Sequence, residues 1–256
     1  MALFRLSAKI INRRQKRSSI AAANYISGQE LHDNREAQVY RQKHKTEIAH
    51  TEIILPDNAP IEFSDRGTLW NAVEQAEDKS TRRASAQSAR EIVLALPNED
   101  EISISELKEL VTKYVTNTFV VHGMIADVAI HDKQNGNPHS HVLLTMREVG
   151  PNGFGLKNRE WNKQLTFWRS EWEKALNTLY REKGLSHIWV SHKSHRVRGD
   201  YEHKPTLHLG PVLSSMERRG VRTQKGDYNR AIEAEREDQK QREQEYQQSR
   251  GRERGR

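Results

Sequence analysis

Two apolar runs separated by a turn-rich segment constrain this chain more than any other part of its sequence. Met124–Ile130 and Val142–Met146 have the composition of buried strands, and residues 132–138 between them are rich in Asn, Gly and Asp and include one Pro. This pattern is typical of a β-hairpin, in which two antiparallel strands lie side by side. The sequence therefore predicts an antiparallel sheet near the middle of the chain.

Three histidines flank the turn of this hairpin, at His131, His139 and His141. Residues two apart on a strand point to the same face, so His139 and His141 project together, and the hairpin brings His131 beside them. Three neutral imidazoles can hold a divalent metal ion and leave coordination positions open for water or a phosphate oxygen. In a basic chain with twelve histidines, some will also lie near one another by chance, as solvated or core-capping groups. The spacing alone leaves both a metal site and a chance cluster open.

Composition restricts the class of partner. The 256 residues, 34% of them hydrophobic, can bury one sizeable core and carry an appendage. A net charge of +7 favours a polyanion as partner, and nucleic acid is a commoner polyanion than an acidic membrane. The absence of cysteine excludes disulfides, thiolate zinc sites and a cysteine nucleophile. Because the chain has no apolar run of about 18 residues and no signal-peptide core, we expect a cytoplasmic protein without membrane insertion.

Strands and helices alternate irregularly along the chain. The apolar patterns predict strands over residues 4–10, 50–55, 91–96, 124–131 and 139–146, and helices over residues 19–26, 69–76, 104–115 and 161–179. Hairpin-linked strands mixed with helices, without a repeating βαβ period, indicate an antiparallel α+β fold. In the last helix Trp161, Trp168 and Trp172 recur at helical spacing, which predicts a buried seam and not a surface for stacking bases.

The end of the chain differs from the rest. Residues 231–256 contain seven basic and seven acidic side chains and almost no apolar ones after Ile232. Such a segment forms at most a solvated helix. We therefore predict a globular domain over residues 1–228 and a charged, helical or disordered tail over residues 229–256, which we interpret as a linker to further C-terminal parts.

One tyrosine has surroundings that suit a nucleophile. Tyr25 follows three alanines on the predicted first helix, shortly after the basic cluster at residues 13–17, and small neighbours would let a DNA strand approach its hydroxyl. A tyrosine hydroxyl needs a base or a nearby cation to attack a phosphate at neutral pH. Taken alone, Tyr25 is more typical of a packed helix residue, so its assignment depends on the rest of the sequence.

Several short motifs occur in a fixed order along residues 1–223. They are Phe4–Lys9, Ser18–Tyr25, Glu52–Pro56, Leu69–Asn71, Ala89–Ile92, Ala95–Pro97, Asn137–His141, Leu207–Pro211 and Gly220–Thr223. Together they resemble the MobA/MobL relaxases of plasmid mobilisation, which belong to the HUH endonuclease superfamily. The resemblance implies an α+β fold with a central five-stranded antiparallel sheet flanked by helices.

The resemblance also implies an activity. Tyr25 would attack one phosphodiester at a plasmid origin of transfer, giving a 5′-phosphotyrosyl linkage and a free 3′-hydroxyl. The three histidines His131, His139 and His141 would hold Mg²⁺ or Mn²⁺. Transesterification conserves the energy of the bond, so the step is reversible and needs no nucleotide, and a phosphate-binding loop of the Walker type is indeed absent. Ser140 stands where the superfamily has a hydrophobic residue, at a position that points away from the metal.

Two acidic residues are further candidates. Glu91, on a predicted central strand, could orient a metal-binding histidine or accept the proton of the tyrosine, and it could instead pair with Arg90 or a helix cap. Asp127 shares the strand face of His131 and could support that histidine. Its more typical role at this position is that of an exposed residue at the start of a strand.

The expected substrate is origin DNA, read as a hairpin duplex followed by a single strand. Seven basic residues are candidates for phosphate contacts: Arg13, Arg14, Lys16, Arg17, Arg218, Arg219 and Arg222. The resemblance further implies accessory relaxosome proteins, a type IV coupling protein and a secretion channel, with export of the protein alongside the transferred strand.

Three other functions fit parts of the pattern. A rolling-circle replication initiator or a transposase of the same superfamily would share the chemistry, but its tyrosine usually follows the histidine pair, as Tyr180 does here. A non-catalytic DNA-binding module would keep the basic surface alone. A metal-dependent phosphohydrolase acting on small substrates would need neither the tyrosine nor the basic surface.

Overall fold

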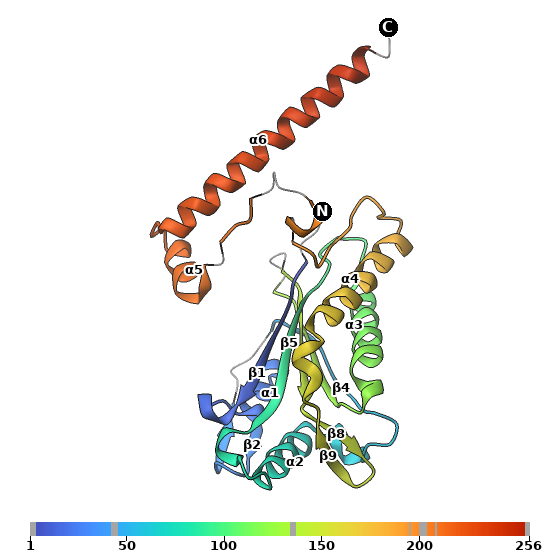
Figure 1. Ribbon diagram of the computed structural model, residues 1–256, viewed down its shortest axis with the longest axis vertical. Coiled ribbons are helices and arrows are strands. Elements are labelled where there is room, and N and C mark those ends of the chain that lie inside the picture. The colour runs from blue at the N-terminus through green and yellow to red at the C-terminus, as the bar shows by residue number, and fades with distance from the viewer. Residues whose placement is uncertain are drawn as a thin grey trace. The chain divides into compact units, whose positions relative to one another are not determined.

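The computed structural model describes residues 4–41, 46–133, 137–194, 196–199, 204–207 and 209–253. Residues 1–192 are built around a five-stranded sheet with the strand order β1-β5-β7-β6-β4, and all neighbours are antiparallel (Figure 1). The strands are β1 (Leu6–Asn12), β4 (Ile48–Ile54), β5 (Gln87–Ala95), β6 (Ala126–His131) and β7 (His139–Thr145). The predicted α+β fold with a central five-stranded antiparallel sheet is therefore confirmed.

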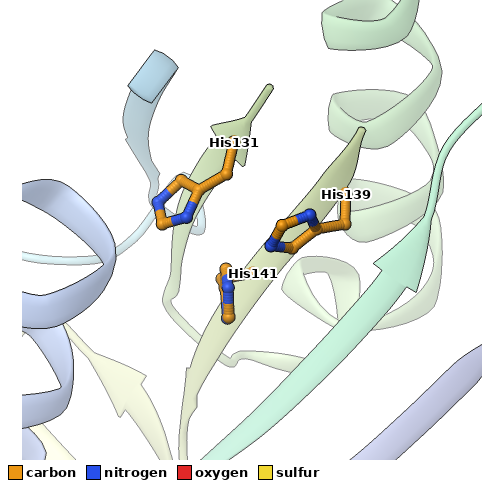
Figure 2. Close-up of side chains that lie close together, drawn as sticks. All are labelled: His131, His139 and His141. Atoms are coloured by element: carbon orange, nitrogen blue, oxygen red, sulfur yellow. The ribbon is translucent and has the colours of Figure 1, made fainter. Parts of the chain in front are cut away.

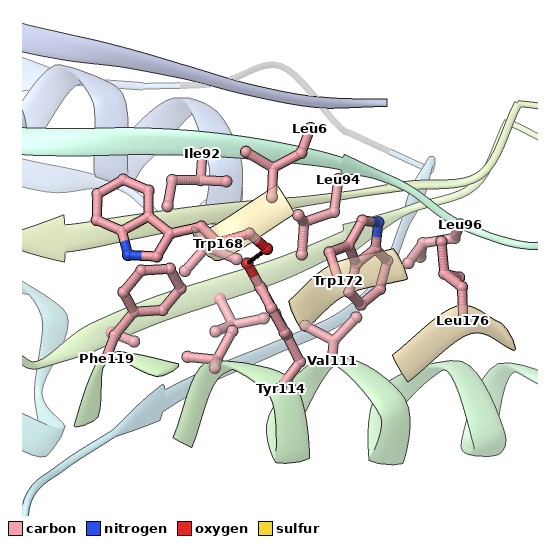
Figure 3. Close-up of a cluster of buried hydrophobic side chains, with 14 of the residues drawn as sticks. Leu6, Ile92, Leu94, Leu96, Val111, Tyr114, Phe119, Trp168, Trp172 and Leu176 are labelled. Atoms are coloured by element: carbon pink, nitrogen blue, oxygen red, sulfur yellow. Dashed lines mark hydrogen bonds between the residues drawn. The ribbon is translucent and has the colours of Figure 1, made fainter. Parts of the chain in front are cut away.

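Two helices, α3 (Ile104–Thr118) and α4 (Leu165–Glu182), cover one face of the sheet. Helix α3 begins with a capping box, in which the side chains and backbone N–H groups of Ser103 and Glu106 bind each other. Trp168 and Trp172 are buried against the sheet, and the Tyr114 hydroxyl donates a hydrogen bond of 3.0 Å to the Trp168 carbonyl (Figure 3). These two tryptophans form the predicted seam, and Trp161 precedes it in the short helix η5 (Glu160–Lys163).

Helices α1 (Ser19–Ser27) and α2 (Arg66–Asp78) pack on the opposite face. The Ser18 side chain accepts hydrogen bonds from the backbone N–H groups of residues 20 and 21, so it caps α1. Gly28 ends the helix with a φ of 70°, a left-handed conformation that glycine adopts without strain. These two caps fix where α1 starts and stops on the sheet.

Two buried carboxylates of α2 fasten other elements to it. Glu74, 3% exposed, accepts a hydrogen bond of 2.5 Å from the Ser19 hydroxyl at the start of α1. Glu77, 1% exposed, accepts from Arg147 at 2.8 Å and from Lys157 at 2.7 Å. Both of these basic residues belong to a hairpin of β8 (Arg147–Gly150) and β9 (Gly153–Lys157), which the sequence patterns do not predict. A second short hairpin, β2 (Leu31–Asp33) with β3 (Gln38–Tyr40), is likewise not predicted.

Both predictions for Asp127, a residue that supports His131 and an exposed residue at the start of a strand, are wrong. Its side chain is fully buried, not exposed, and within the described residues its hydrogen-bond partners are Arg66 and Trp70 and no histidine. Arg66, at the start of α2, donates to both of its oxygens at 2.8 and 2.9 Å, and the Trp70 indole donates a further bond of 2.9 Å. Asp127 therefore joins α2 to strand β6 as a structural residue.

The chain divides into two compact units, residues 1–192 and residues 193–256. The second unit contains α5 (Gly210–Arg218) and α6 (Gln224–Glu253). The boundary expected after residue 228 thus falls inside α6, because the residues before and after it continue one helix. At the turn before α6, Glu217 accepts hydrogen bonds from the backbone and hydroxyl of Thr223 at 2.6 and 2.7 Å, which ties α6 to α5. No helix in the described ranges is long and apolar enough to cross a membrane.

Candidate metal centre and nucleophile

The three histidines of the hairpin converge on one point. His131 on β6 lies directly opposite His139 on β7, and His141 pairs with Ala129, so all three side chains point to the sheet face that carries α1. Their ring centroids are 4.8 to 5.6 Å apart, and one nitrogen of each ring lies within 4.8 Å of the others. Figure 2 shows the rings turned toward a common space between the two strands.

Hydrogen bonds set the orientation of two of the rings. His131 Nε2 lies 2.7 Å from the Ile26 carbonyl at the end of α1, and His139 Nδ1 lies 3.0 Å from the Asn137 carbonyl. A carbonyl can only accept, so each of these nitrogens carries the proton and the other nitrogen of the ring carries the lone pair. Burial lowers the pKa of the His139 imidazole and favours its neutral form, which is the form that binds metals.

His141 has the clearest sign of a missing ligand. Its Nδ1 donates to the Glu91 carboxylate at 2.9 Å, which leaves the lone pair on Nε2. Nε2 is buried and has no hydrogen-bond partner among the described residues. A buried nitrogen without a partner is costly unless something else binds it, and a metal ion held by the three imidazoles would do so. The residues present therefore fit a divalent metal ion.

Glu91 binds His141 through one carboxylate oxygen and Lys9 through the other. It is 5% exposed, and its second carboxylate oxygen lies 2.7 Å from the Lys9 ammonium on the neighbouring strand β1. Burial would raise the pKa of the Glu91 carboxyl, but the hydrogen bonds from His141 and Lys9 outweigh it and hold this pKa below its usual range. Arg90, the other partner considered, projects from the opposite face of the sheet and lies 5.3 Å from the Trp168 ring.

Sequence reasoning missed Lys9. Its role depends on the register in which β1 pairs with β5, where Lys9 lies directly opposite Glu91. The two residues are far apart in the sequence, and no local pattern specifies which residue of one strand faces which residue of the other. The alternation of residues 4–10 places Lys9 on one face of its strand and gives no further signal.

Tyr25 lies beside the histidines. It projects from the last turn of α1, is 47% exposed, and its ring centroid lies 5.8 Å from that of His141 and 6.4 Å from that of His131. An exposed tyrosine next to a candidate metal centre is an arrangement that suits attack on a phosphate. Tyr180, the other tyrosine considered, is 2% exposed on the opposite face and donates to Glu99.

The basic residues expected to contact DNA fall into different environments. The guanidinium of Arg13 is 6% exposed and binds Glu74 at 2.6 Å and Asp78 at 2.7 Å, so it is a structural group and not a phosphate ligand. The other residues of the set are exposed, with Arg14, Lys16 and Arg17 in the first unit and Arg218, Arg219 and Arg222 in the second.

The fold and the site together define a class of protein. Its members have a five-stranded antiparallel sheet that carries a candidate metal centre of three histidines and, beside it, an exposed tyrosine as candidate nucleophile. The model of the MobA/MobL family matches residues 17–219, and the chain belongs to this family.

Individual relatives agree with this assignment. The chain is 31% identical to "Mobilization protein MobL" of Acidithiobacillus ferridurans, over 86% of this chain and 65% of that protein. It is 28% identical to "Probable mobilization protein MobA" of Bifidobacterium longum, over 91% of this chain and 47% of that protein. It thus spans about half to two thirds of the length of these two relatives. In the solved structure "Molecular Basis of Vancomycin Resistance Transfer in Staphylococcus aureus", one chain matches with a TM-score of 0.68 and 30% identity, over 75% of this chain and 100% of that one.

Proposed function

We propose that this chain is a relaxase, which nicks one DNA strand at a plasmid origin of transfer and becomes covalently attached to it. The observation that carries the proposal is the placement of Tyr25 beside His131 and His141, two members of the histidine triad, on elements that are far apart in the sequence. Membership of the MobA/MobL family and the mobilization proteins among its relatives support the biological setting.

The proposed step is a transesterification. The Tyr25 oxygen attacks the phosphorus atom of one phosphodiester and loses its proton to a base or to solvent. The bond from phosphorus to the 3′-oxygen breaks, and this oxygen takes up a proton, so the products are a 5′-phosphotyrosyl linkage and a 3′-hydroxyl. One phosphoester bond replaces another, which makes the step reversible without a nucleotide. A divalent ion bound by the histidines would grip the scissile phosphate and stabilise its developing charge.

The proposed ligands of that ion are His131, His139 and His141. Glu91 acts by orienting His141, and the structure favours this role over that of a proton acceptor, because His141 and Lys9 already occupy its two oxygens. We propose Mg²⁺ or Mn²⁺ as the ion in the cell. Imidazole ligands favour Mn²⁺, since magnesium prefers oxygen donors, so the purified protein should bind Mn²⁺ more tightly.

The proposed substrate is the single strand that follows a hairpin in the origin DNA. As a mobilization protein, the chain would act with accessory relaxosome proteins and would leave the cell through a type IV coupling protein and secretion channel. These partners follow from the family.

The test is a search for a covalent adduct. The full chain is incubated with Mn²⁺ or Mg²⁺ and with single-stranded DNA from the region that flanks its own gene, and the products are separated under denaturing conditions. We expect a DNA adduct that mass spectrometry maps to the Tyr25 peptide and that a chelator abolishes. Cleavage without an adduct would indicate a nuclease that uses water, and binding of every DNA of that region without cleavage would indicate a non-catalytic module.

Lys9 provides a prediction that does not depend on cleavage. Replacing Lys9 by Met removes the ammonium that holds the second oxygen of Glu91, so Glu91 should orient His141 less well. We expect Mn²⁺ to bind about tenfold more weakly, the lower end of the effect known for residues that support metal ligands. Titration calorimetry or the electron paramagnetic resonance of free Mn²⁺ measures the change.

Two further variants control this experiment. Lys9→Arg keeps a cation at the same place and should restore most of the affinity. Lys183→Met breaks a bond of 2.9 Å to Glu106 on the opposite face of the sheet and should leave Mn²⁺ binding unchanged. Equal Mn²⁺ affinity in the Lys9→Met variant and the parent protein would contradict the role assigned to Lys9.

A further inference from the structure

Six exposed basic side chains gather at the end of the sheet away from the histidines. Three come from the segment around η1 (Arg13–Gln15), and three come from the end of α2 and the segment that leads into η3 (Arg83–Ser85). We call this surface the basic end and define it by Arg14, Lys16, Arg17, Lys79, Arg82 and Arg83, all of which are exposed. Only Arg14, Lys16 and Arg17 were predicted from the sequence to contact DNA.

Arg13 holds the two segments of the basic end together. Its backbone N–H donates to the Ala86 carbonyl at 3.0 Å, and its guanidinium donates to the Arg83 carbonyl at 3.1 Å. The same guanidinium binds the side chains of Glu74 and Asp78 on α2. Residues that lie about seventy positions apart in the sequence are thereby fixed side by side, and the basic end has a defined shape.

The charge of the basic end is not neutralised by the protein. The three acidic side chains in the second half of α2 are Glu74, Glu77 and Asp78, and each already binds a basic residue that is not part of the basic end. None of the six cations forms an ion pair with any residue in the described ranges of the chain. Like charges held together in this way repel one another unless a polyanion binds them.

The basic end is separate from the candidate metal centre but connected to it. Val93 of β5 pairs with His141, and Gln87 at the other end of the same strand lies next to η3. Six residues of strand at about 3.3 Å each place the two sites about 20 Å apart. Helix α1 begins shortly after η1 and carries Tyr25 in its last turn beside His141, and its nine residues at about 1.5 Å each cover about 13 Å of this distance.

We propose that the basic end is a second DNA-binding site, which holds backbone phosphates several nucleotides away from the bond that Tyr25 attacks. This inference rests on the proposed function for the identity of the polyanion. Exposed ammonium and guanidinium groups bind backbone phosphates of any sequence, and such contacts carry no sequence information. The basic end therefore contributes affinity and positions the DNA, while sequence is read elsewhere.

The experiment neutralises the half of the basic end that the sequence did not indicate. The triple variant K79Q/R82Q/R83Q is compared with K108Q/K113Q/R181Q, which removes the same charge from exposed positions on α3 and α4. Both are measured by fluorescence anisotropy with the full chain, at salt concentrations from about 50 to about 200 mM. One DNA covers only the nick region, and a longer DNA extends it through the flanking hairpin.

For the longer DNA, we expect the slope of log affinity against log salt to fall in magnitude by about 2 to 3 in K79Q/R82Q/R83Q, since each lost phosphate contact contributes about 0.7 to 0.9. The control variant should keep the slope of the parent protein. The short DNA should bind both variants equally and, if the proposed function holds, form the Tyr25 adduct at an unchanged rate.

Two results would overturn the proposal. One is an equal salt slope for the parent and K79Q/R82Q/R83Q on the longer DNA. The other is unchanged DNA binding together with a loss of binding to vesicles of phosphatidylserine and phosphatidylcholine, which would assign the basic end to a membrane surface. Neither measurement requires cleavage, so failure of the proposed function would appear as a missing adduct and not as a changed slope.

Discussion

Replacing Tyr25 by Phe should abolish the covalent DNA adduct while DNA binding and metal binding persist. The substitution removes one oxygen atom, the proposed nucleophile, and leaves the aromatic ring beside His131 and His141 in place. Without that oxygen only water can attack the phosphate, so the rate of strand cleavage should fall by more than about a thousandfold. Because Tyr25 is 47% exposed, the free energy of unfolding should change by less than about 0.5 kcal/mol.

The matched control for Tyr25→Phe is Tyr180→Phe. That hydroxyl is buried on the opposite face and binds Glu99, so its loss should cost about 1 kcal/mol of stability and leave the adduct unchanged. Both variants are assayed by denaturing gel for the adduct and by anisotropy for DNA affinity. An adduct of normal yield in Tyr25→Phe would contradict the assignment of Tyr25 as the nucleophile. An adduct lost only in Tyr180→Phe would favour a replication initiator, whose tyrosine follows the histidine pair in the sequence.

Replacing Asp127 by Ala should lower the free energy of unfolding by about 3 to 5 kcal/mol, the largest stability effect that we expect in this chain. The carboxylate is fully buried and accepts three hydrogen bonds from Arg66 and one from Trp70. Its removal leaves a buried guanidinium without a counter-charge and a buried indole N–H without an acceptor. Urea denaturation should show a lower midpoint at a nearly constant slope.

Two comparisons separate this effect from a general sensitivity to lost charges. Glu160→Ala removes an exposed partner of Lys163 and should change stability by less than about 1 kcal/mol. The double variant Arg66→Met/Asp127→Leu removes both buried charges and should be more stable than Asp127→Ala alone. A loss below about 1 kcal/mol in Asp127→Ala would show that water or a rearranged Arg66 replaces the carboxylate.

The parts of the fold that could be predicted are those that depend on residues close together in the sequence, such as apolar runs, turns and helix caps. Strands β6 and β7 follow from two apolar runs and a turn, and the alternation of side chains along them brings His139 and His141 to one face. Helix α1 follows from Ser18 and Gly28, each of which acts on its own immediate neighbours. Hairpins of three to five residues per strand, such as β2 with β3, have too few residues for a period to be read.

The parts that could not be predicted depend on partners distant in the sequence. Arg13 has the same local surroundings as Arg14, yet the first is bound by α2 and the second is exposed. Lys9 and Glu91 meet only because β1 pairs with β5 in one register. Ion pairs between residues so far apart in the sequence leave no periodic signal. The histidines and Tyr25 could therefore be predicted from the sequence, whereas supporting residues such as Lys9 could not.

The bond between His131 and the carbonyl of Ile26 makes the proposed nucleophile and the candidate metal centre mechanically dependent on each other. The residue that follows Tyr25 in the chain holds the ring of His131, a proposed metal ligand, so a displacement of the last turn of α1 disturbs both sites at once. The link is made by the backbone, so substitution of the Ile26 side chain leaves its acceptor in place. A substitution of Ile26 can therefore change how α1 packs, but the hydrogen bond from His131 to the backbone of residue 26 remains possible in every variant that keeps the fold.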